Sequence, residues 1–202
     1  MFCKKNKSMF YKKVSLFCFI LFCTFASLSQ GVVAKTIEED ISTYSGLEKA
    51  ISTYMFDTLV NQQYSTFEKH DTKGNVIIRG EDNEKPAFIY CFMTNCKGCE
   101  IDFIDVFPKL LTEFKDKIDF ILLTPSTIDQ LESEKNFLPD LPIIILPRTN
   151  FKFGFPMAYL LDRQNNIIIT RSGGAGGTSP KHSKKIHYNI LKKWFLKVIE
   201  DK

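Results

Sequence analysis

The chain has 202 residues, 44% of them hydrophobic, with 19 phenylalanines and a formal net charge of +4. This is enough for one domain with additions and a substantial hydrophobic core. Five of the lysines precede residue 14, and the rest of the chain has 22 basic and 23 acidic residues. Such a near-neutral chain lacks the excess positive charge of a nucleic-acid-binding protein, so we expect no nucleic-acid partner.

The N-terminal segment has the pattern of a secretory signal peptide. The five lysines precede an uncharged apolar run over residues 14–28, and small residues follow at Ser27 and Ser29. We therefore expect a signal peptide over 1–29, with cleavage after Ala34 as an alternative. An uncleaved membrane anchor is disfavoured, because the run is shorter than the ~20 residues of a spanning helix.

Export also limits what the cysteines can do. Cleavage removes three of the six cysteines and leaves Cys91, Cys96 and Cys99. Three cysteines are too few for a scaffold stapled by disulfides, whereas one pair and one spare fit a redox protein. We expect the protein in the periplasm of a Gram-negative bacterium, or anchored in the membrane if the signal segment is not cleaved.

Two elements are expected before the main domain begins its central sheet. Residues 30–63 form an N-terminal extension, in which apolar residues at helical spacing predict a helix over about 46–62 that only packs on the sheet. The runs 64–67 and 75–79 flank an Asp- and Gly-containing turn, which predicts a β-hairpin.

The most informative stretch is a buried strand followed by a cysteine pair. Seven apolar or aromatic residues over 87–93 predict a strand that is buried on both faces. Cys96-Lys97-Gly98-Cys99 follows, and then a helical pattern over 101–114. Cys96 should therefore lie at a helix N-terminus, where free N–H groups and the charge of Lys97 favour the thiolate.

The same Cys-x-x-Cys spacing also occurs in zinc sites, which need two further ligands. His70, His182 and His187 are isolated in the sequence and Cys91 lies in the predicted strand, so the redox interpretation is favoured. We expect both late histidines at the surface. A copper-handling or purely binding role remains the alternative, because two thiolates suit copper(I).

The second half of the chain alternates strands and helices. Strands are predicted over 117–124 and 141–146, with a helix over 126–137 between them, and the segment 153–170 predicts two strands joined by a turn. The Gly-rich run 172–177 is interpreted as a loop and not as a nucleotide cradle. An amphipathic helix over 180–199 ends the chain, with Ile186 in its apolar stripe. Proline at 108 should kink or divide the helix after the cysteines.

These motifs, in this order, resemble the thioredoxin-like superfamily, and in particular its extracytoplasmic, TlpA-like branch, over residues 64–200. The resemblance rests on three features: the strand–Cys-x-x-Cys–helix unit, Gly154-x-Pro156 with the following Leu-Leu-Asp and hairpin, and the terminal helix. The chain departs from the family at Met157, where threonine is usual, and at Asn95, where an aromatic residue is usual. Tyr90 occupies the position at which many members carry a buried acid.

The resemblance implies an α/β thioredoxin-like fold over 64–202, with a central mixed sheet flanked by helices. It implies a thiol–disulfide oxidoreductase in which Cys96 attacks and Cys99 resolves, while Lys97 and Gly98 tune the redox potential. In the family the proline is cis and faces the cysteines, so Pro156 and the Phe155 backbone should hold the substrate. We expect no cofactor or metal, a monomer, and protein thiols, disulfides and an unidentified redox protein as partners.

Overall fold

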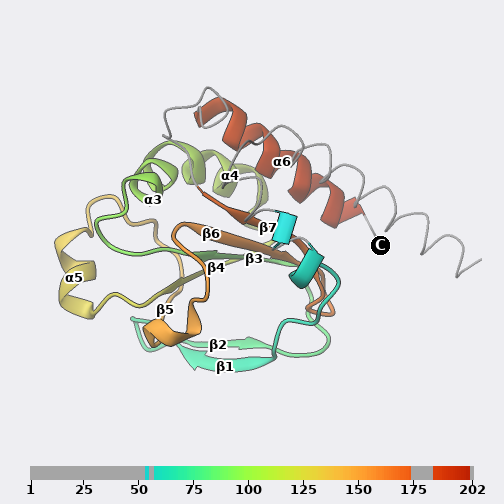
Figure 1. Cartoon of the computed structure of the whole chain (residues 1–202), viewed down its shortest axis with the longest axis horizontal. Helices are drawn as coiled ribbons and strands as arrows, with labels where there is room; N and C mark the ends of the chain where they lie inside the picture. The colour runs from blue at the N-terminus through green and yellow to red at the C-terminus, as the bar shows by residue number, and fades with distance from the viewer. Residues whose placement is uncertain (1–52, 55–56, 174–183, 201–202) are drawn as a thin grey trace, which may run out of the picture. The chain divides into compact units, whose positions relative to one another are not determined.

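The computed structural model describes residues 53–54, 57–173 and 184–200 (Figure 1). The predicted signal peptide with its cleavage site, most of the N-terminal helix, most of the Gly-rich loop and His182 lie outside these residues. Within them, no helix is long and apolar enough to span a bilayer. Residues 53–54 and 57–59 are helical, and the helix stops before Asn61, whose φ of 66° is left-handed. The predicted end at 62 was therefore three residues too late.

A five-stranded mixed sheet forms the centre of the described structure, as expected. Its order is β5-β4-β3-β6-β7, with β3 parallel to β4 and antiparallel to β6. Every residue of β3 is buried, which explains its uninterrupted apolar sequence. The strands are β3 Ala87–Cys91, β4 Asp119–Thr124, β5 Ile143–Ile145, β6 Met157–Leu161 and β7 Ile167–Ser172.

Helices α3, α4 and α6 cover one face of this sheet (Figure 1). Successive residues of β3 point to opposite faces, so Phe88 and Tyr90 face these helices while Cys91 faces away. The Phe88 ring lies 4.9 Å from that of Phe195 on α6 and belongs to a core of aromatic rings in edge contact. The helical segments are α3 Lys97–Ile101, the π-helical turn η1 Asp102–Val106, α4 Phe107–Phe114 and α6 Lys184–Glu200.

Pro108 divides the helix after the cysteines, which was one of the two predicted effects. It lies in the first turn of α4, where its missing N–H costs little. The preceding turn is π-helical, and the Phe107 amide donates to the carbonyl of Asp102, five residues earlier. The helix therefore widens where the proline would otherwise clash with the preceding turn.

The predicted hairpin is present and packs on the other face of the sheet. It comprises β1 Phe67–His70 and β2 Val76–Arg79, and its Phe67 and Ile77 pack against the apolar cluster there. Arg79 fixes its end: the guanidinium, 2% exposed, donates to Asn165 Oδ1 at 3.0 Å and to Asp119 Oδ2 at 3.1 Å. The hairpin is thus tied to both the β3–β4 side and the β6–β7 turn.

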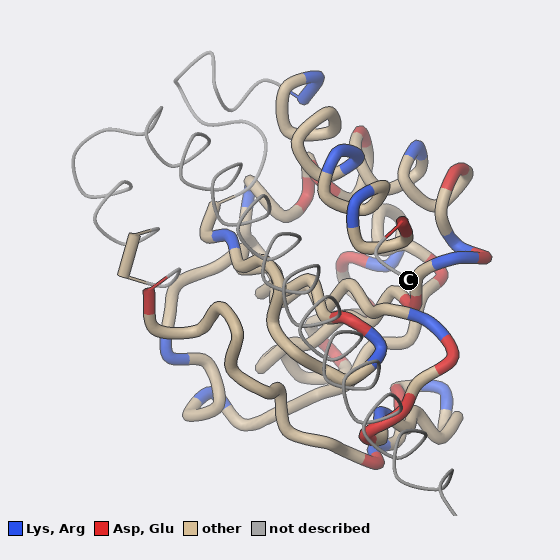
Figure 2. The backbone as a smooth tube through the Cα atoms, turned by 90° about the vertical axis from the view of Figure 1, so that its right-hand side faces the viewer, with Lys and Arg blue, Asp and Glu red and all other residues tan. Residues whose placement is uncertain are grey.

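One further helix and one short turn complete the fold. α5 Ile128–Ser133 begins at a capping box formed by Thr127 and Gln130, within the range predicted for it. The 3₁₀ turn η2 Arg148–Asn150 follows β5 and was not predicted. Acidic and basic residues are interspersed along the described backbone (Figure 2), in keeping with the near-neutral composition.

Candidate active site

The loop between β3 and α3 is held in place by residues on both sides of α5. The Thr94 amide donates to Ser126 Oγ at 3.0 Å, and the Asn95 amide donates to Glu134 Oε1 at 2.6 Å. Asn95 has a φ of 62°, a left-handed conformation that asparagine tolerates better than most residues. These contacts fix the position at which Cys96 enters the helix.

Cys96 caps α3, and a disulfide joins it to Cys99, with Cα atoms 5.2 Å apart. The sulfur of Cys96 accepts a hydrogen bond from the Cys99 amide at 3.3 Å. Cys96 is half-buried whereas Cys99 is 2% exposed. The predicted position of Cys96 at the helix start is therefore correct, and Cys96 is the more exposed of the two cysteines.

The two residues between the cysteines differ in exposure. Lys97 is exposed and its ammonium lies 2.9 Å from Glu100 Oε2, one turn along the helix. The positive charge expected beside Cys96 is thus paired with a carboxylate, and in water such an exposed pair is screened. Gly98 is half-buried in the same turn.

Phe155 and Pro156 lie at the same end of the sheet as the cysteine loop. The register pairs Cys91, at the end of β3, with Met157, at the start of β6, so Pro156 lies beside the residue that follows β3. The Phe155–Pro156 peptide bond is cis, as the resemblance implies. Pro156 is buried and its carbonyl accepts from the Gly173 amide.

The Phe155 side chain remains accessible beside this buried proline. It is half-buried, with its ring 5.2 Å from that of Phe151 and with the guanidinium of Arg148 4.8 Å from its centroid. These two contacts restrict the motion of the Phe155 ring, so its apolar surface keeps a defined orientation.

Cys91 is placed away from the pair. It is buried in the apolar cluster on the hairpin side of the sheet, next to a small cavity of about 90 Å³. Burial raises the pKa of its thiol to about 12, so the group stays neutral. The predicted burial of Cys91 is confirmed.

No protein-family model and no curated protein sequence matches the chain. Solved structures do match it. One is assigned as the thiol:disulfide interchange protein DsbE of Chlorobium tepidum, with 13% identity, a TM-score of 0.56, and coverage of 70% of this chain and 99% of that one. Another is assigned as a protein disulfide isomerase of Bacteroides thetaiotaomicron, with 12% identity, a TM-score of 0.56, and coverage of 70% and 91%.

A third is the C-terminal domain of a protein assigned as a thiol-disulfide oxidoreductase, also from Bacteroides thetaiotaomicron. It has 13% identity and a TM-score of 0.52, with coverage of 71% of this chain and 97% of that one. The chain has the thioredoxin-like fold. The expected fold class is therefore confirmed.

Within this thioredoxin-like fold, sequence reasoning missed a buried polar cluster behind the cysteines. Tyr90 donates its hydroxyl to Asp102 Oδ2 at 2.6 Å, and His187 Nε2 lies 3.3 Å from Asp102 Oδ1. The expectation that His187 is at the surface was wrong: the residue is 1% exposed. The sequence contained the signal, because His187 precedes Leu191 and Trp194 by four and seven residues on the buried face of α6.

The burial of His187 also corrects the predicted apolar stripe of α6, the last helix of the thioredoxin-like fold. Ile186, expected in the stripe, is 41% exposed, and His187 occupies the buried position instead. The physical reason is the carboxylate of Asp102, which needs a polar neighbour where α6 crosses η1. Among the described residues, no group of three or more histidine, cysteine or acidic side chains could hold a metal ion.

Proposed function

We propose that this chain is an exported thiol–disulfide oxidoreductase that exchanges a Cys96–Cys99 dithiol or disulfide with protein substrates. One observation carries the proposal: a disulfide lies at the start of a helix that follows the central buried strand, with Cys96 partly exposed and Cys99 buried. In this arrangement the Cys96 sulfur can react with a substrate, and the Cys99 sulfur is placed to attack the resulting mixed disulfide.

The chemistry needs only the two cysteines and a substrate. In the reductive direction, the Cys96 thiolate attacks one sulfur of a substrate disulfide, and the other substrate sulfur leaves as a thiolate that takes a proton from water. Cys99 then attacks the Cys96 sulfur, which forms the internal disulfide and releases the second substrate thiol. Two electrons pass from the cysteine pair to the substrate, and the reverse sequence oxidises a substrate dithiol.

Lys97 and Gly98 are proposed to set the redox potential, because they determine how well the first turn stabilises a thiolate. A free N–H at the helix start lowers the pKa of a thiol, and the charge of Lys97 adds to this effect only as far as Glu100 leaves it unpaired. Replacing either residue should therefore shift the potential without removing the reaction.

Phe155 and Pro156 are proposed to bind the substrate chain. Both lie at the sheet end where the loop to Cys96 begins, and the half-buried ring of Phe155 can pack on a substrate side chain. A peptide held there would place its own cysteine near Cys96. This favours protein substrates over small thiols.

Export is proposed from the N-terminal pattern of lysines, apolar run and small residues, with the periplasm as the compartment and an uncleaved anchor as the alternative. An oxidising compartment supplies substrates of the required kind. No cofactor enters the proposed chemistry, and a monomer suffices for it because both reacting sulfurs belong to one helix.

Reduction of insulin by dithiothreitol tests the proposal directly. The protein should accelerate the precipitation of insulin chains, and Cys96→Ser should abolish the acceleration. Lys109→Ala, an exposed change on α4, serves as the matched control and should act like the wild type. No acceleration by the wild type would reject an oxidoreductase. Mass spectrometry with and without copper(I) then tests the alternative, which requires a metal adduct that Cys96→Ser and Cys99→Ser remove.

A further inference from the structure

A fully buried carboxylate lies one helical turn beyond Cys99. Asp102 is 0% exposed and follows Cys99 by three residues, so the two side chains lie on the same face of the helix. Its backbone amide donates to the carbonyl of Cys99. Side chains at this spacing are neighbours, with Cβ atoms about 5–6 Å apart. Asp102 is thus the buried acid of the cysteine helix itself.

Residues of two other elements contact this carboxylate. Tyr90 of β3 donates to Oδ2 at 2.6 Å, a length typical of an O–H donor and a charged carboxylate. His187 of α6 lies 3.3 Å from the other oxygen, Oδ1, with its side chain 2% exposed. Burial, and secondly the negative Asp102, raise the pKa of Tyr90 far above its usual range, so its hydroxyl stays a donor.

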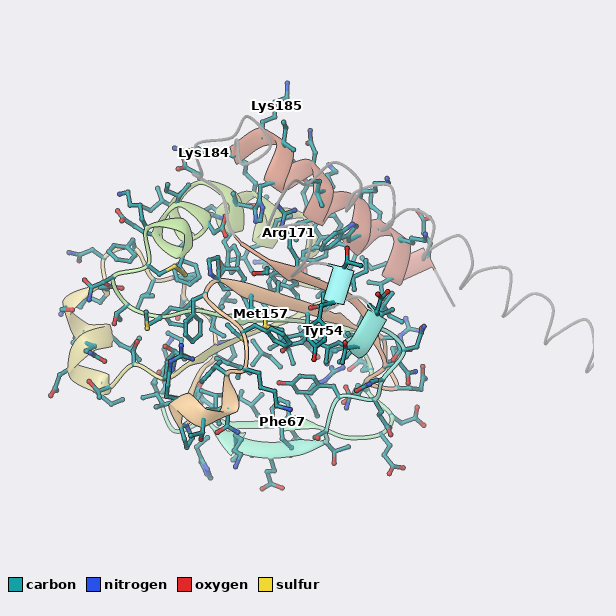
Figure 3. The ribbon with its side chains drawn as sticks, viewed as in Figure 1. Tyr54, Phe67, Met157, Arg171, Lys184 and Lys185 are labelled. Carbon is teal, nitrogen blue, oxygen red and sulfur yellow. A yellow bond between two sulfur atoms is a disulfide. The ribbon has the colours of Figure 1, made fainter. Side chains whose placement is uncertain are left out.

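A buried positive charge stands nearby on the sheet. The register places Tyr90, Ala158 and Arg171 on one rung across β3, β6 and β7, and directly opposed residues share a face. The small Ala158 leaves room for the guanidinium to act on Tyr90, whose pKa it lowers against the larger effect of burial. Figure 3 shows Arg171 on the α6 side of the sheet, and the residue is 3% exposed.

The other charged groups of these elements face outward. Glu100 pairs with Lys97 at 2.9 Å, and Asp105 pairs with Lys184 at 2.5 Å on the rim of η1 and α6. Neither carboxylate is buried. Asp102 therefore differs from both neighbouring acids on its helix, since it is shielded from water and accepts a hydrogen bond from the buried Tyr90 hydroxyl.

Burying a carboxylate costs free energy, so a buried carboxylate is expected to have a function or strongly stabilising partners. The neighbouring Cys99 suggests the function. Its thiol is shielded from solvent, yet it must lose a proton before it can attack the Cys96 sulfur. Water cannot readily take that proton, whereas a carboxylate on the same buried helix face can.

We propose that Asp102 accepts the proton of the Cys99 thiol during resolution of the mixed disulfide, and that Tyr90 and His187 position it. The inference rests on the proposed oxidoreductase function. In this step the Cys99 S–H bond breaks and its proton passes to an Asp102 carboxylate oxygen. The Cys99 sulfur bonds to the Cys96 sulfur, the bond from Cys96 to the substrate breaks, and its electron pair leaves on the substrate sulfur. Asp102 holds the proton until the internal disulfide is next reduced, when the proton returns to the Cys99 sulfur.

The test follows the reaction of reduced protein with 5,5′-dithiobis(2-nitrobenzoate) by stopped flow. Attack by Cys96 releases a first coloured thiolate, and attack by Cys99 on the resulting mixed disulfide releases a second. Asp102→Asn should leave the first release within about twofold and slow the second by about tenfold or more, because general-base assistance commonly contributes 10²–10⁴-fold. Asp105→Asn, on the same π-helical turn, should change neither release.

The variants of the partners separate proton transfer from simple packing. Tyr90→Phe keeps the ring and removes the hydrogen bond to Asp102, and His187→Leu removes the imidazole beside the carboxylate. Each should slow the second release by about two- to fivefold. The rate of the second release should level off with rising pH in the wild type and rise log-linearly in Asp102→Asn, a change that mere loss of packing would not cause.

The outcomes distinguish the two proposals. If reduced wild type gives no second release, or if Cys96→Ser reacts like the wild type, the proposed function fails. If both releases occur and Asp102→Asn gives a second release within twofold of wild type, the function stands and the role of Asp102 is rejected. Should Asp102→Asn not fold, Tyr90→Phe decides, because an unchanged second rate and pH profile would also reject the role.

Discussion

The backbone amide of Cys99 donates to the sulfur of Cys96 across 3.3 Å, so the first turn of α3 supplies a hydrogen bond to the exposed end of the cysteine pair. Amides at a helix start otherwise have no partner in the helix. An anionic sulfur is a better acceptor than a neutral one, and therefore this contact favours the Cys96 thiolate in the reduced protein.

From this relationship we predict that Cys96 attacks and Cys99 resolves. Cys99→Ser should trap mixed disulfides with substrate proteins, because attack still occurs and resolution does not. Cys96→Ser should trap few or none. Non-reducing gels of the two variants after mixing with oxidised insulin measure the difference, and the reverse pattern would exchange the two roles while leaving the fold unaffected.

Thiol labelling should report only a disulfide and an inert thiol in the native, oxidised protein. In protein that begins after the predicted signal peptide, iodoacetamide at pH 8 should modify none of the three cysteines, because Cys96 and Cys99 are bonded and Cys91 is buried with a pKa of about 12. Unfolding this protein in urea should expose Cys91 alone to labelling, as mass spectrometry can show. Labelling of Cys96 and Cys99 in protein isolated without reductant would mean that the pair is held reduced in the cell.

Stability should fall at alkaline pH because of Cys91. Burial raises the pKa of this thiol from 9.0 to about 12, so the folded chain holds the proton more tightly than the unfolded chain. Its contribution is complete below pH 9 and is lost as the pH rises towards 12, by about 1.4 kcal/mol per pH unit. Urea unfolding at pH 7 and 10 should show a smaller loss for Cys91→Ala than for the wild type. An equal loss of stability in the two proteins would mean that folding does not raise the pKa of Cys91.

Cys91→Ala should also leave thiol exchange almost unchanged. The thiol points to the sheet face opposite the helices, so it does not belong to the reacting pair. Insulin reduction by this variant should stay within about twofold of wild type. A loss as large as that of Cys96→Ser would show that Cys91 takes part in the exchange.

Phe155 should matter for protein substrates and not for small ones. Phe155→Ala removes the ring that Phe151 and Arg148 support and should lower kcat/KM for insulin by about fivefold, equivalent to the loss of ~1 kcal/mol of contact. The first release from 5,5′-dithiobis(2-nitrobenzoate) should be unchanged. Lys152→Ala, exposed in the same loop, is the control. Equal losses with both substrates would point to a disturbed site and not to substrate contact.

The fold should depend far more on one arginine than on exposed ion pairs. Arg79 is buried and bonds to Asn165, Asp119 and two backbone carbonyls, so Arg79→Ala should lower the free energy of unfolding by about 3 kcal/mol. Lys73→Ala removes an exposed pair with Asp140 and should cost far less, because water and salt screen such a pair. Urea unfolding at pH 7 compares them, and similar values would mean that the hairpin is not anchored through Arg79.

Some of the site could be predicted because its signals are local. The strand before Cys96 has an uninterrupted apolar run, and a run of this kind indicates burial on both faces whatever it packs against. The helix after it shows the 3.6-residue period, so Cys96 falls at its start by counting alone. Pro108 likewise acts on its own helix, since the missing N–H affects a carbonyl only four residues away.

His187 could not be assigned as easily, because its burial depends on a residue 85 positions earlier. Where a histidine and an isoleucine are neighbours on an amphipathic helix, the free energy of transfer from water favours burial of the isoleucine. The position is decided instead by the Asp102 carboxylate, which is already buried by η1 and hydrogen-bonded to Tyr90. The widened π-helical turn that carries Asp102 has no simple sequence pattern.

The sequence by itself determined the order of strands and helices, the place of the cysteine pair at a helix start and the burial of Cys91. Each of these depends on neighbours within a few residues, where periodicity and backbone chemistry act. Only the tertiary structure decided that Tyr90, Asp102 and His187 meet, that Arg79 anchors the hairpin, and that Phe155 stands at the cysteine end of the sheet. Those contacts join residues far apart in the chain, and they form because packing the helices on the sheet makes buried charges and hydrogen-bonding groups find partners.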